Sequence, residues 1–293
     1  MTEFSSNELP GLPMKYLLDE GIQKLRGSDT ARLDTELLLC KILQLDRIQI
    51  YSQSGFEIPA DKIRTFRLLL DKRIAGIPVA YLIGHKEFWS LDLYVNEHTL
   101  VPRPETECLV ETVLTHVPEN TNYSILDLGT GSGAIAIALA SERPDCKITA
   151  IDTCEGALAI AKLNAERHGL DQIHFKQSNW FTCIQDTFDI IVSNPPYISS
   201  GDKLLLRGDI VHEPSLALDG GHDGLDDIRT IIGRSVIHFN TGGWLFIEHG
   251  YNQGHSVREL FRQHGYTGVK TCPDYAGLDR FTLGKINNNQ CAN

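Results

Sequence analysis

The sequence lacks any long apolar run, any paired cysteine motif and any excess of basic residues. No stretch approaches the roughly 18 consecutive apolar residues that a transmembrane helix needs. The polar first ten residues contain no apolar segment of the kind found in a signal peptide. These absences predict a soluble protein that works in the cytoplasm, away from membranes.

The seven cysteines are scattered along the chain. They form no CxxC pair, and no histidine accompanies them at the spacing of a metal site. An odd number of thiols without a secretion signal is typical of a reducing compartment. We therefore expect buried free thiols, no disulfide framework and no metal centre.

Acidic residues outnumber basic residues by 38 to 27, and the formal net charge is −11. Because broad binding to nucleic-acid backbones depends on clustered Lys and Arg, we expect no stable complex with DNA or RNA. The hydrophobic content of 42% is enough for a substantial core, and 293 residues allow one large or two smaller domains. We expect a monomer.

Residues 1–76 are predicted to form a small helical domain. Apolar residues recur at helical spacing in three segments, over about 16–25, 31–43 and 60–74. In the third segment, the apolar positions expected to face inward are Ile63, Phe66, Leu70 and Ile74. The basic positions expected to face solvent are Lys62, Arg64, Arg67, Lys72 and Arg73.

A boundary follows at Gly76-Ile77-Pro78. Short β-type runs at 81–84, 87–89 and 91–95 predict a β-hairpin linker within residues 77–108. In the segment Val-Pro-Arg-Pro-Glu-Thr-Glu, Pro104 is a good first helical residue, and Glu105 and Glu107 suit the positive end of a helix. Helix capping is the simplest role for these acids. Arg103 stands near the expected cleft, with its role open.

From Tyr123 the chain alternates between strand and helix patterns. The expected strands lie at 123–128, 147–152, 173–175, 188–192 and 243–248, and helices at 134–142 and 155–168. This alternation predicts a mostly parallel, Rossmann-like sheet with helices on both faces, over residues 109–286. Two final strands, at 269–272 and 280–283, are close enough to form a hairpin and so an antiparallel edge strand. Residues 287–293 form a polar tail.

A glycine-rich loop joins the first of these strands to a helix. Its candidate cofactor-binding residues are Gly129, Thr130, Gly131, Ser132 and Gly133. Glycines let the backbone turn tightly and approach a ligand, and the helix N-terminus points N–H groups at it. Asp152 ends the second strand, where its carboxylate can accept both hydroxyls of a ribose. These features fit either a nicotinamide cofactor or S-adenosylmethionine.

Two further residues follow the third strand. Asn179 could form a hydrogen bond with an adenine edge, and Trp180 could line an adenine pocket. Trp180 could equally be a core residue, because large aromatic side chains dominate cores.

The fourth strand stops abruptly at Asn194-Pro195-Pro196-Tyr197. Two prolines cannot donate to a sheet ladder, and each one forces the preceding residue into an extended conformation. The result is a stiff corner at the carboxyl end of a strand, where ligands bind in open α/β sheets. A planar NH2 group could donate to Asn194 Oδ1 and to the Pro195 carbonyl, with Tyr197 against its flat face. A simple strand-ending turn is the alternative.

Taken together, these residues resemble the class I S-adenosylmethionine methyltransferases, and more narrowly the peptide chain release factor glutamine N5-methyltransferases (the PrmC or HemK family). Nearly the whole chain contributes to the resemblance. The matching stretches are 31–39, 73–84, 101–107, 126–133, 194–198, 213–221, 248–250 and 274–280.

The resemblance implies a seven-stranded methyltransferase domain and a helical N-terminal domain that recognises the release factor. It implies that S-adenosylmethionine contacts the glycine loop, Asp152, Trp180 and Asn194, and leaves as S-adenosylhomocysteine. It further implies that Asn194 to Tyr197 bind the glutamine of a Gly-Gly-Gln motif, with Asn194, Pro195 and Tyr197 as catalytic residues. Asn179 departs from the family, in which Asp is frequent at this position.

Three other hypotheses explain part of the pattern. An adenine-N6 nucleic-acid methyltransferase shares Asn-Pro-Pro-Tyr, but it needs a basic track for the nucleic-acid backbone. A nicotinamide-dependent dehydrogenase would explain the glycine loop and Asp152, but not Asn-Pro-Pro-Tyr. A cofactor-binding scaffold without activity gives no reason for that motif either.

Overall fold

The computed structural model describes residues 11–287 of the chain. The chain divides into two compact units, with the division between Gly84 and His85. Each unit has its own hydrophobic core. Within residues 11–287, no helix has the length and apolar character needed to cross a membrane.

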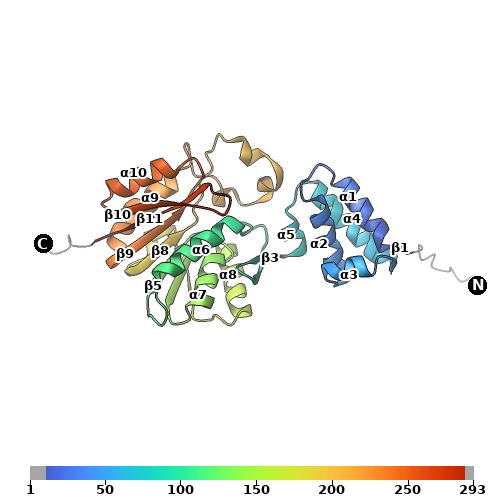
Figure 1. The fold of residues 1–293 in the computed structure, drawn as a ribbon, viewed down its shortest axis with the longest axis horizontal. Coiled ribbons are helices and arrows are strands. Elements are labelled where there is room, and N and C mark those ends of the chain that lie inside the picture. The colour runs from blue at the N-terminus through green and yellow to red at the C-terminus, as the bar shows by residue number, and fades with distance from the viewer. Residues whose placement is uncertain (1–10, 288–293) are drawn as a thin grey trace, which may run out of the picture. The chain divides into compact units, whose positions relative to one another are not determined.

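The first unit is a small helical bundle (Figure 1). Its helices are α1 (Met14–Lys24), α2 (Ala31–Leu43), α3 (Arg47–Ser52), α4 (Ala60–Ile74) and α5 (Val79–Ile83). Two short strands, β1 (Leu12–Pro13) and β2 (Glu57–Ile58), pair antiparallel. The predicted limits of the second and third helical segments are confirmed by α2 and α4, whereas α3 was not predicted.

Residues 81–84 form the end of a helix and not the predicted strand. Helix α5 directly follows Pro78, whose extended conformation suits a residue that precedes a helix. Gly84 ends it in the left-handed region, with φ of 85°. The apolar run was too short to separate a strand from one helical turn.

The predicted inner face of α4 is wrong at its last turn. Arg73 is buried, and its Nε donates a hydrogen bond to Asp34 Oδ2 at 2.7 Å. Ile74, which was predicted to face inward, is half exposed. The buried stripe runs through positions 63, 66, 70 and 73, in the alternating steps of three and four residues that a helix face follows. Arginine is favoured at position 73 because the buried Asp34 carboxylate on α2 needs a cationic partner.

The second unit begins with the predicted hairpin, formed by β3 (His85–Phe88) and β4 (Leu91–Tyr94). Its two-residue turn, Trp89–Ser90, has positive φ at both positions, as in the turns that match the twist of a hairpin. Glu107 Oε1 accepts a hydrogen bond from the Trp89 backbone N–H at 2.9 Å. Glu107 therefore fastens the turn to the helix that follows.

The predicted seven-stranded Rossmann-like sheet is confirmed, with the strand order β10-β11-β9-β8-β5-β6-β7. Its strands are β5 (Ser124–Leu128), β6 (Lys147–Asp152), β7 (His174–Gln177), β8 (Phe188–Ser193), β9 (Phe239–Glu248), β10 (Thr267–Pro273) and β11 (Asp279–Lys285). Strands β5 to β9 are mutually parallel. The predicted final hairpin is present, and its strand β11 pairs antiparallel with β9 while β10 forms the edge.

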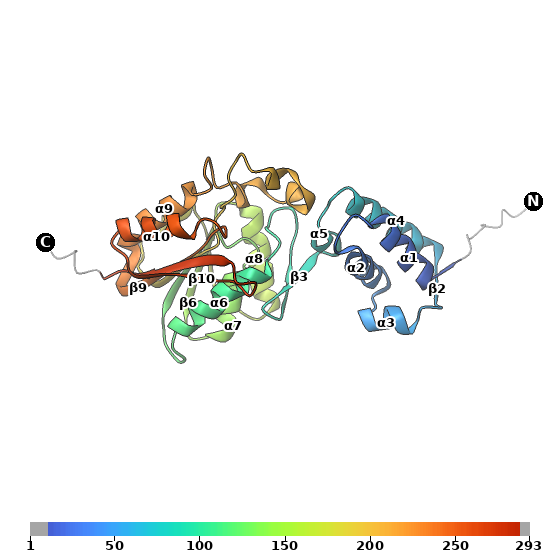
Figure 2. The same ribbon diagram turned by 45° about the horizontal axis from the view of Figure 1, so that its top comes forward.

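Helices cover both faces of this sheet (Figures 1 and 2). One core contains residues of α6 (Pro104–His116) and α7 (Ala134–Glu142) and one of α8 (Glu155–Arg167). The other contains residues of α9 (Asp226–Ser235) and α10 (Gly254–Gln263). Neighbouring residues of one strand contribute to opposite cores, as with Val192 and Ile191 of β8. The predicted helix start at Pro104 is confirmed.

A long connection between β8 and α9 was not predicted. It contains three short 3-10 helices, Lys203–Leu206, Gly208–His212 and Ser215–Ala217. A fourth, Trp180–Cys183, follows β7. Both connections leave the sheet at the carboxyl ends of parallel strands, which is where ligand sites form in this architecture.

The six cysteines within the described residues are free thiols. The expectation of burial holds for Cys108 and Cys146, whereas Cys183 is exposed and the others are partly buried. Cys291 and residues 288–293 of the predicted tail lie outside the described residues. The division of the chain at residues 76, 108 and 286 stays a prediction.

The buried Arg73–Asp34 pair gives a test of the first unit. Replacing Arg73 with Met would leave the Asp34 carboxylate buried without its cation, which typically costs about 3–5 kcal/mol. The neighbouring Lys72 is exposed, so Lys72→Met should change the free energy of unfolding by less than about 0.5 kcal/mol. Urea unfolding followed by circular dichroism measures both. Equal stability of the two variants would contradict the account.

Candidate active site

The site begins where β5 and β8 end side by side. Leu128 and Ser193, the last residues of these strands, are register partners. The Ser193 hydroxyl also donates a hydrogen bond to the Leu128 carbonyl at 2.7 Å. Because the strands end at the same level, the glycine loop from Gly129 and the corner from Asn194 leave the sheet next to each other.

The loop after β5 depends on its glycines. Gly129, Gly131 and Gly133 all have positive φ, of 74°, 57° and 85°. A Cβ on Gly133 would lie 2.8 Å from Ile137 Cδ1. These positions favour glycine because other residues rarely adopt the conformation.

Two carboxylates tie this loop to the strand ends. Asp127 accepts a hydrogen bond from the Thr130 hydroxyl at 2.6 Å, and burial raises its pKa to about 7. Asp152 Oδ2 accepts from the Gly131 N–H at 2.9 Å, and Oδ1 accepts from the Cys154 N–H at 2.8 Å. Burial raises the pKa of Asp152, although these two hydrogen bonds act to lower it. Each Asp152 oxygen keeps a further lone pair that can accept from a ligand.

Trp180 lies beside the loop in an uncommon backbone conformation, with φ of 48°. Its ring would contact a Cβ on Gly129 at 3.5 Å. Its indole N–H donates to Asp227 Oδ1 at 2.9 Å, and burial raises the pKa of Asp227. The strained conformation and the hydrogen bond together fix the ring over the loop.

At the corner after β8, Pro195 and Pro196 are buried, and Asn194 and Tyr197 are partly buried. The Asn194 side-chain amide donates from Nδ2 to Thr106 Oγ1 at 3.2 Å. The Tyr197 hydroxyl donates to Glu248 Oε1 at 3.3 Å, and burial raises the pKa of Tyr197. The corner therefore presents the Asn194 side chain with its nitrogen already engaged.

Glycines of the β8–α9 connection pack directly against this corner. A Cβ on Gly220 would lie 2.7 Å from the Pro196 carbonyl oxygen. Gly224 has φ of 75°, and a Cβ there would lie 2.3 Å from the Tyr197 carbonyl oxygen. This backbone-to-backbone packing accounts for glycine at positions 220 and 224.

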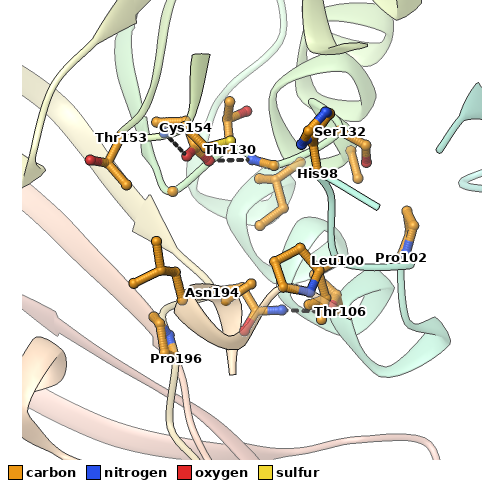
Figure 3. Close-up of a pocket in the computed structure, with 18 of the residues that line it drawn as sticks. His98, Leu100, Pro102, Thr106, Thr130, Ser132, Thr153, Cys154, Asn194 and Pro196 are labelled. Carbon is orange, nitrogen blue, oxygen red and sulfur yellow. Dashed lines mark hydrogen bonds between the residues drawn. The ribbon is translucent and has the colours of Figure 1, made fainter. Parts of the chain in front are cut away.

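A cavity of about 380 Å³ joins the loop and the corner (Figure 3). In Figure 3, Thr153 and Cys154 lie across the open space from Asn194 and Pro196. The lining includes these sequence-predicted site residues: Gly129, Thr130, Gly131, Ser132, Asp152, Asn179, Trp180, Asn194 and Pro196. A smaller recess of about 90 Å³ is lined by Asn194 and Tyr197. Gly133 and Pro195 are not among the lining residues of either.

The cavity is acidic. Glu97, Asp152 and Asp227 line it, and Arg103 is its only Lys or Arg among the described residues. The Arg103 guanidinium is paired with Glu213, a buried carboxylate that also accepts from the Val101 N–H at 3.0 Å. Arg103, whose role the sequence left open, is therefore a structural partner of Glu213.

Sequence reasoning missed several residues of this site. Thr106 Oγ1 donates to Glu248 Oε2 at 2.8 Å, and both residues are buried. Thr106 lies in the Val-Pro-Arg-Pro-Glu-Thr-Glu segment, and Glu248 ends β9 beside β8. Their positions at strand and helix ends were a usable signal for both, but Asp227 had none, because the helix that carries it was not predicted.

Two family models match the chain. The methyltransferase small domain matches residues 106–222, and the PrmC N-terminal domain matches residues 16–84. A release factor glutamine methyltransferase of Aliivibrio fischeri is 44% identical over 278 residues, covering 94% of this chain and 98% of that protein. The chain belongs to the release factor glutamine methyltransferase family.

Other members of the family agree with this assignment. The release factor glutamine methyltransferase of Pseudomonas aeruginosa is 46% identical, over 89% of this chain and 95% of that protein. The release factor glutamine methyltransferase of Escherichia coli is 44% identical, over 92% of this chain and 98% of that protein. Among solved structures, a methyltransferase from Pyrococcus furiosus shares the fold at 22% identity, with a TM-score of 0.52 over 77% of this chain and 98% of that chain. The chain is thus a methyltransferase.

The packing of Gly220 against the corner is testable. We expect Gly220→Ala to lower the free energy of unfolding by about 1–3 kcal/mol, because the new methyl group would overlap backbone atoms. Gly201→Ala, in the same connection, places its methyl group in open space and serves as the control. Thermal unfolding measures both variants. A Gly220→Ala protein as stable as Gly201→Ala would contradict the described packing.

Proposed function

We propose that the protein transfers the methyl group of S-adenosyl-L-methionine to the side-chain amide nitrogen (N5) of the glutamine in the Gly-Gly-Gln motif of peptide chain release factors, and so modulates translation termination. The observation that carries this proposal is the orientation of Asn194. Its nitrogen is held by Thr106, so its oxygen remains to accept a hydrogen bond from a substrate that enters the cavity it lines.

The cavity fits S-adenosylmethionine in the chemistry of its lining. Asp152 has lone pairs to accept ribose hydroxyls, and Trp180 offers an aromatic face to adenine, with Asn179 also in the lining. The carboxylates of Glu97, Asp152 and Asp227 suit a cationic ligand. The proposed cofactor contacts are Gly129 to Gly133, Asp152, Asn179, Trp180 and Asn194.

When bound, S-adenosylmethionine supplies a methyl group activated by a sulfonium, and S-adenosylhomocysteine is the product. The protein has to orient the amide, because the amide nitrogen is a poor nucleophile and position matters more than basicity. Asn194 Oδ1 and the Pro195 carbonyl would each accept a hydrogen bond from the NH2 group of the substrate glutamine. They would stabilise the positive charge that develops on its nitrogen.

The remaining corner residues limit the motion of the amide. Pro195 and Pro196 are buried and conformationally restricted. Tyr197 lines the recess beside Asn194 and would pack against the amide plane. No strong base belongs to the motif, so the proton would leave to water after transfer.

The partner is proposed to be a release factor, without a stable nucleic-acid complex, and the first unit, matched by the PrmC N-terminal domain, would recognise it. We propose that the enzyme acts in the cytoplasm as a monomer.

The two rival chemistries receive less support from the cavity. A nicotinamide dinucleotide carries a pyrophosphate, which would face an acidic lining whose one guanidinium is already paired with Glu213. An adenine-N6 methyltransferase acting on nucleic acid would bring a phosphate backbone to the same acidic surroundings.

The catalytic role of Asn194 can be measured directly. We expect Asn194→Ala to slow methylation of a release factor by roughly 10²-fold or more, because a positioned polar group is lost. The methylated residue is mapped by peptide mass spectrometry. A release factor in which alanine replaces the glutamine of Gly-Gly-Gln is the matched control and should stay unmodified. Methylation of that control, or an Asn194→Ala rate equal to wild type, would contradict the proposal.

Cofactor identity has a separate test that needs no release factor. Asp152→Ala should weaken S-adenosylhomocysteine binding about 10-fold or more, since hydrogen bonds to a charged group contribute roughly 1.5–3 kcal/mol. Isothermal titration calorimetry gives the affinities, with NADH titrated in parallel. Tight NADH binding without S-adenosylhomocysteine binding would favour the dehydrogenase instead.

A further inference from the structure

Three linked hydrogen bonds connect both polar side chains of the corner to one buried carboxylate. Asn194 Nδ2 donates to Thr106 Oγ1 at 3.2 Å, Thr106 Oγ1 donates to Glu248 Oε2 at 2.8 Å, and Tyr197 donates to Glu248 Oε1 at 3.3 Å. Thr106 is 4% exposed and Glu248 is 1% exposed, so bulk water does not compete for the hydrogen bond between them.

We propose that Thr106 and Glu248 are positioning residues that fix the direction of the Asn194 amide, with its oxygen toward the substrate, and that hold Tyr197 on the same carboxylate. This inference rests on the proposed function of Asn194 as the acceptor for the glutamine amide. It adds two residues, from α6 and β9, to the machinery of the corner.

The number of available protons decides which way the Asn194 amide is oriented. A side-chain amide can present either its oxygen or its NH2 group to a ligand, and only its partners decide which. The Thr106 hydroxyl has one proton. Because the Glu248 carboxylate can only accept, it takes that proton in a hydrogen bond, and the Thr106 oxygen must then accept from Asn194. The amide nitrogen is therefore directed to Thr106, and Oδ1 is left for the substrate.

The surroundings of Glu248 make this arrangement sensitive to pH. Burial raises the pKa of Glu248 to about 7, and the Thr106 hydrogen bond, Arg280 and the Tyr197 hydrogen bond act in the opposite direction. Arg280, on β11, is itself paired with Asp274 at 3.0 Å, and Glu105, on α6, adds a weak repulsion.

Protonation of Glu248 would reverse the direction of the hydrogen bonds that run through Thr106 to Asn194. A neutral Glu248 carboxyl can donate its proton to Thr106, whose hydroxyl is then free to donate to the Asn194 oxygen. The Asn194 NH2 group would turn toward the substrate amide, which also presents N–H bonds, and donor would face donor. We therefore expect activity to be retained above the pKa of Glu248 and to fall as the pH decreases through it.

The decisive comparison is between Thr106→Val and Thr106→Ser. Valine keeps the shape and removes the hydroxyl, whereas serine keeps the hydroxyl and removes only a methyl group. We expect Thr106→Val to lower kcat for release factor methylation by roughly 10²-fold, the scale of a misplaced catalytic group, and Thr106→Ser to keep most of it. Glu248→Gln should also lower kcat, because one carboxylate oxygen becomes an NH2 group, which cannot accept the hydrogen bond that Thr106 or Tyr197 donates.

Two further readouts separate positioning from general damage. Calorimetry should show that S-adenosylhomocysteine still binds Thr106→Val, which confirms a folded site. The fall of kcat toward acidic pH should be present in wild type and Thr106→Ser and absent in Thr106→Val, whose Asn194 no longer senses Glu248. A fall in all three proteins would instead point to Asp127, whose pKa burial also raises to about 7, and would contradict the role of Glu248.

Equal kcat values for Thr106→Val and Thr106→Ser, or the same acidic fall in both, would overturn this inference. The proposed function would stand in that case, because wild type would still methylate the glutamine. If wild type itself methylated no release factor while binding S-adenosylhomocysteine, the proposed function would fail instead.

Discussion

The hydrogen bond from the Ser193 hydroxyl to the Leu128 carbonyl is the constraint on which the rest of the site depends. It joins the last residues of two adjacent parallel strands, which are also register partners. The glycine loop and a proline corner that cannot continue a ladder therefore start at the same edge of the sheet. The cavity lies between these two segments because the strands end at the same level.

The rest of the second unit holds these two segments in place. Carboxylates at the ends of β5 and β6 accept hydrogen bonds from the loop. Glycines of the β8–α9 connection allow its backbone to pack against the corner. Burial makes these contacts strong, but it also raises the pKa of Asp127 and of Glu248 to about 7. The acidic residues that line the cavity, Glu97, Asp152 and Asp227, favour a cationic ligand over a pyrophosphate.

Local patterns predicted the parts of the fold that local physics determines. The limits of α2 and α4 followed from apolar spacing, and the glycine loop followed from its composition. Arg73 was misplaced, because its burial depends on Asp34, which lies 39 residues earlier in the chain. The hydrogen bond between Asn194 and Thr106 joins residues 88 positions apart in the sequence, and that between Thr106 and Glu248 joins residues 142 positions apart. Such contacts have no local signature, so only the fold reveals them.

The proposed function requires a substrate amide to bind at the corner of Asn194 and Pro195, beside the cavity. A crystal structure with S-adenosylhomocysteine and a Gly-Gly-Gln peptide tests it most directly. We expect the glutamine side-chain nitrogen at about 2.7–3.2 Å from both Asn194 Oδ1 and the Pro195 carbonyl oxygen. A glutamine bound elsewhere, or an Asn194 whose nitrogen faces the peptide, would contradict it.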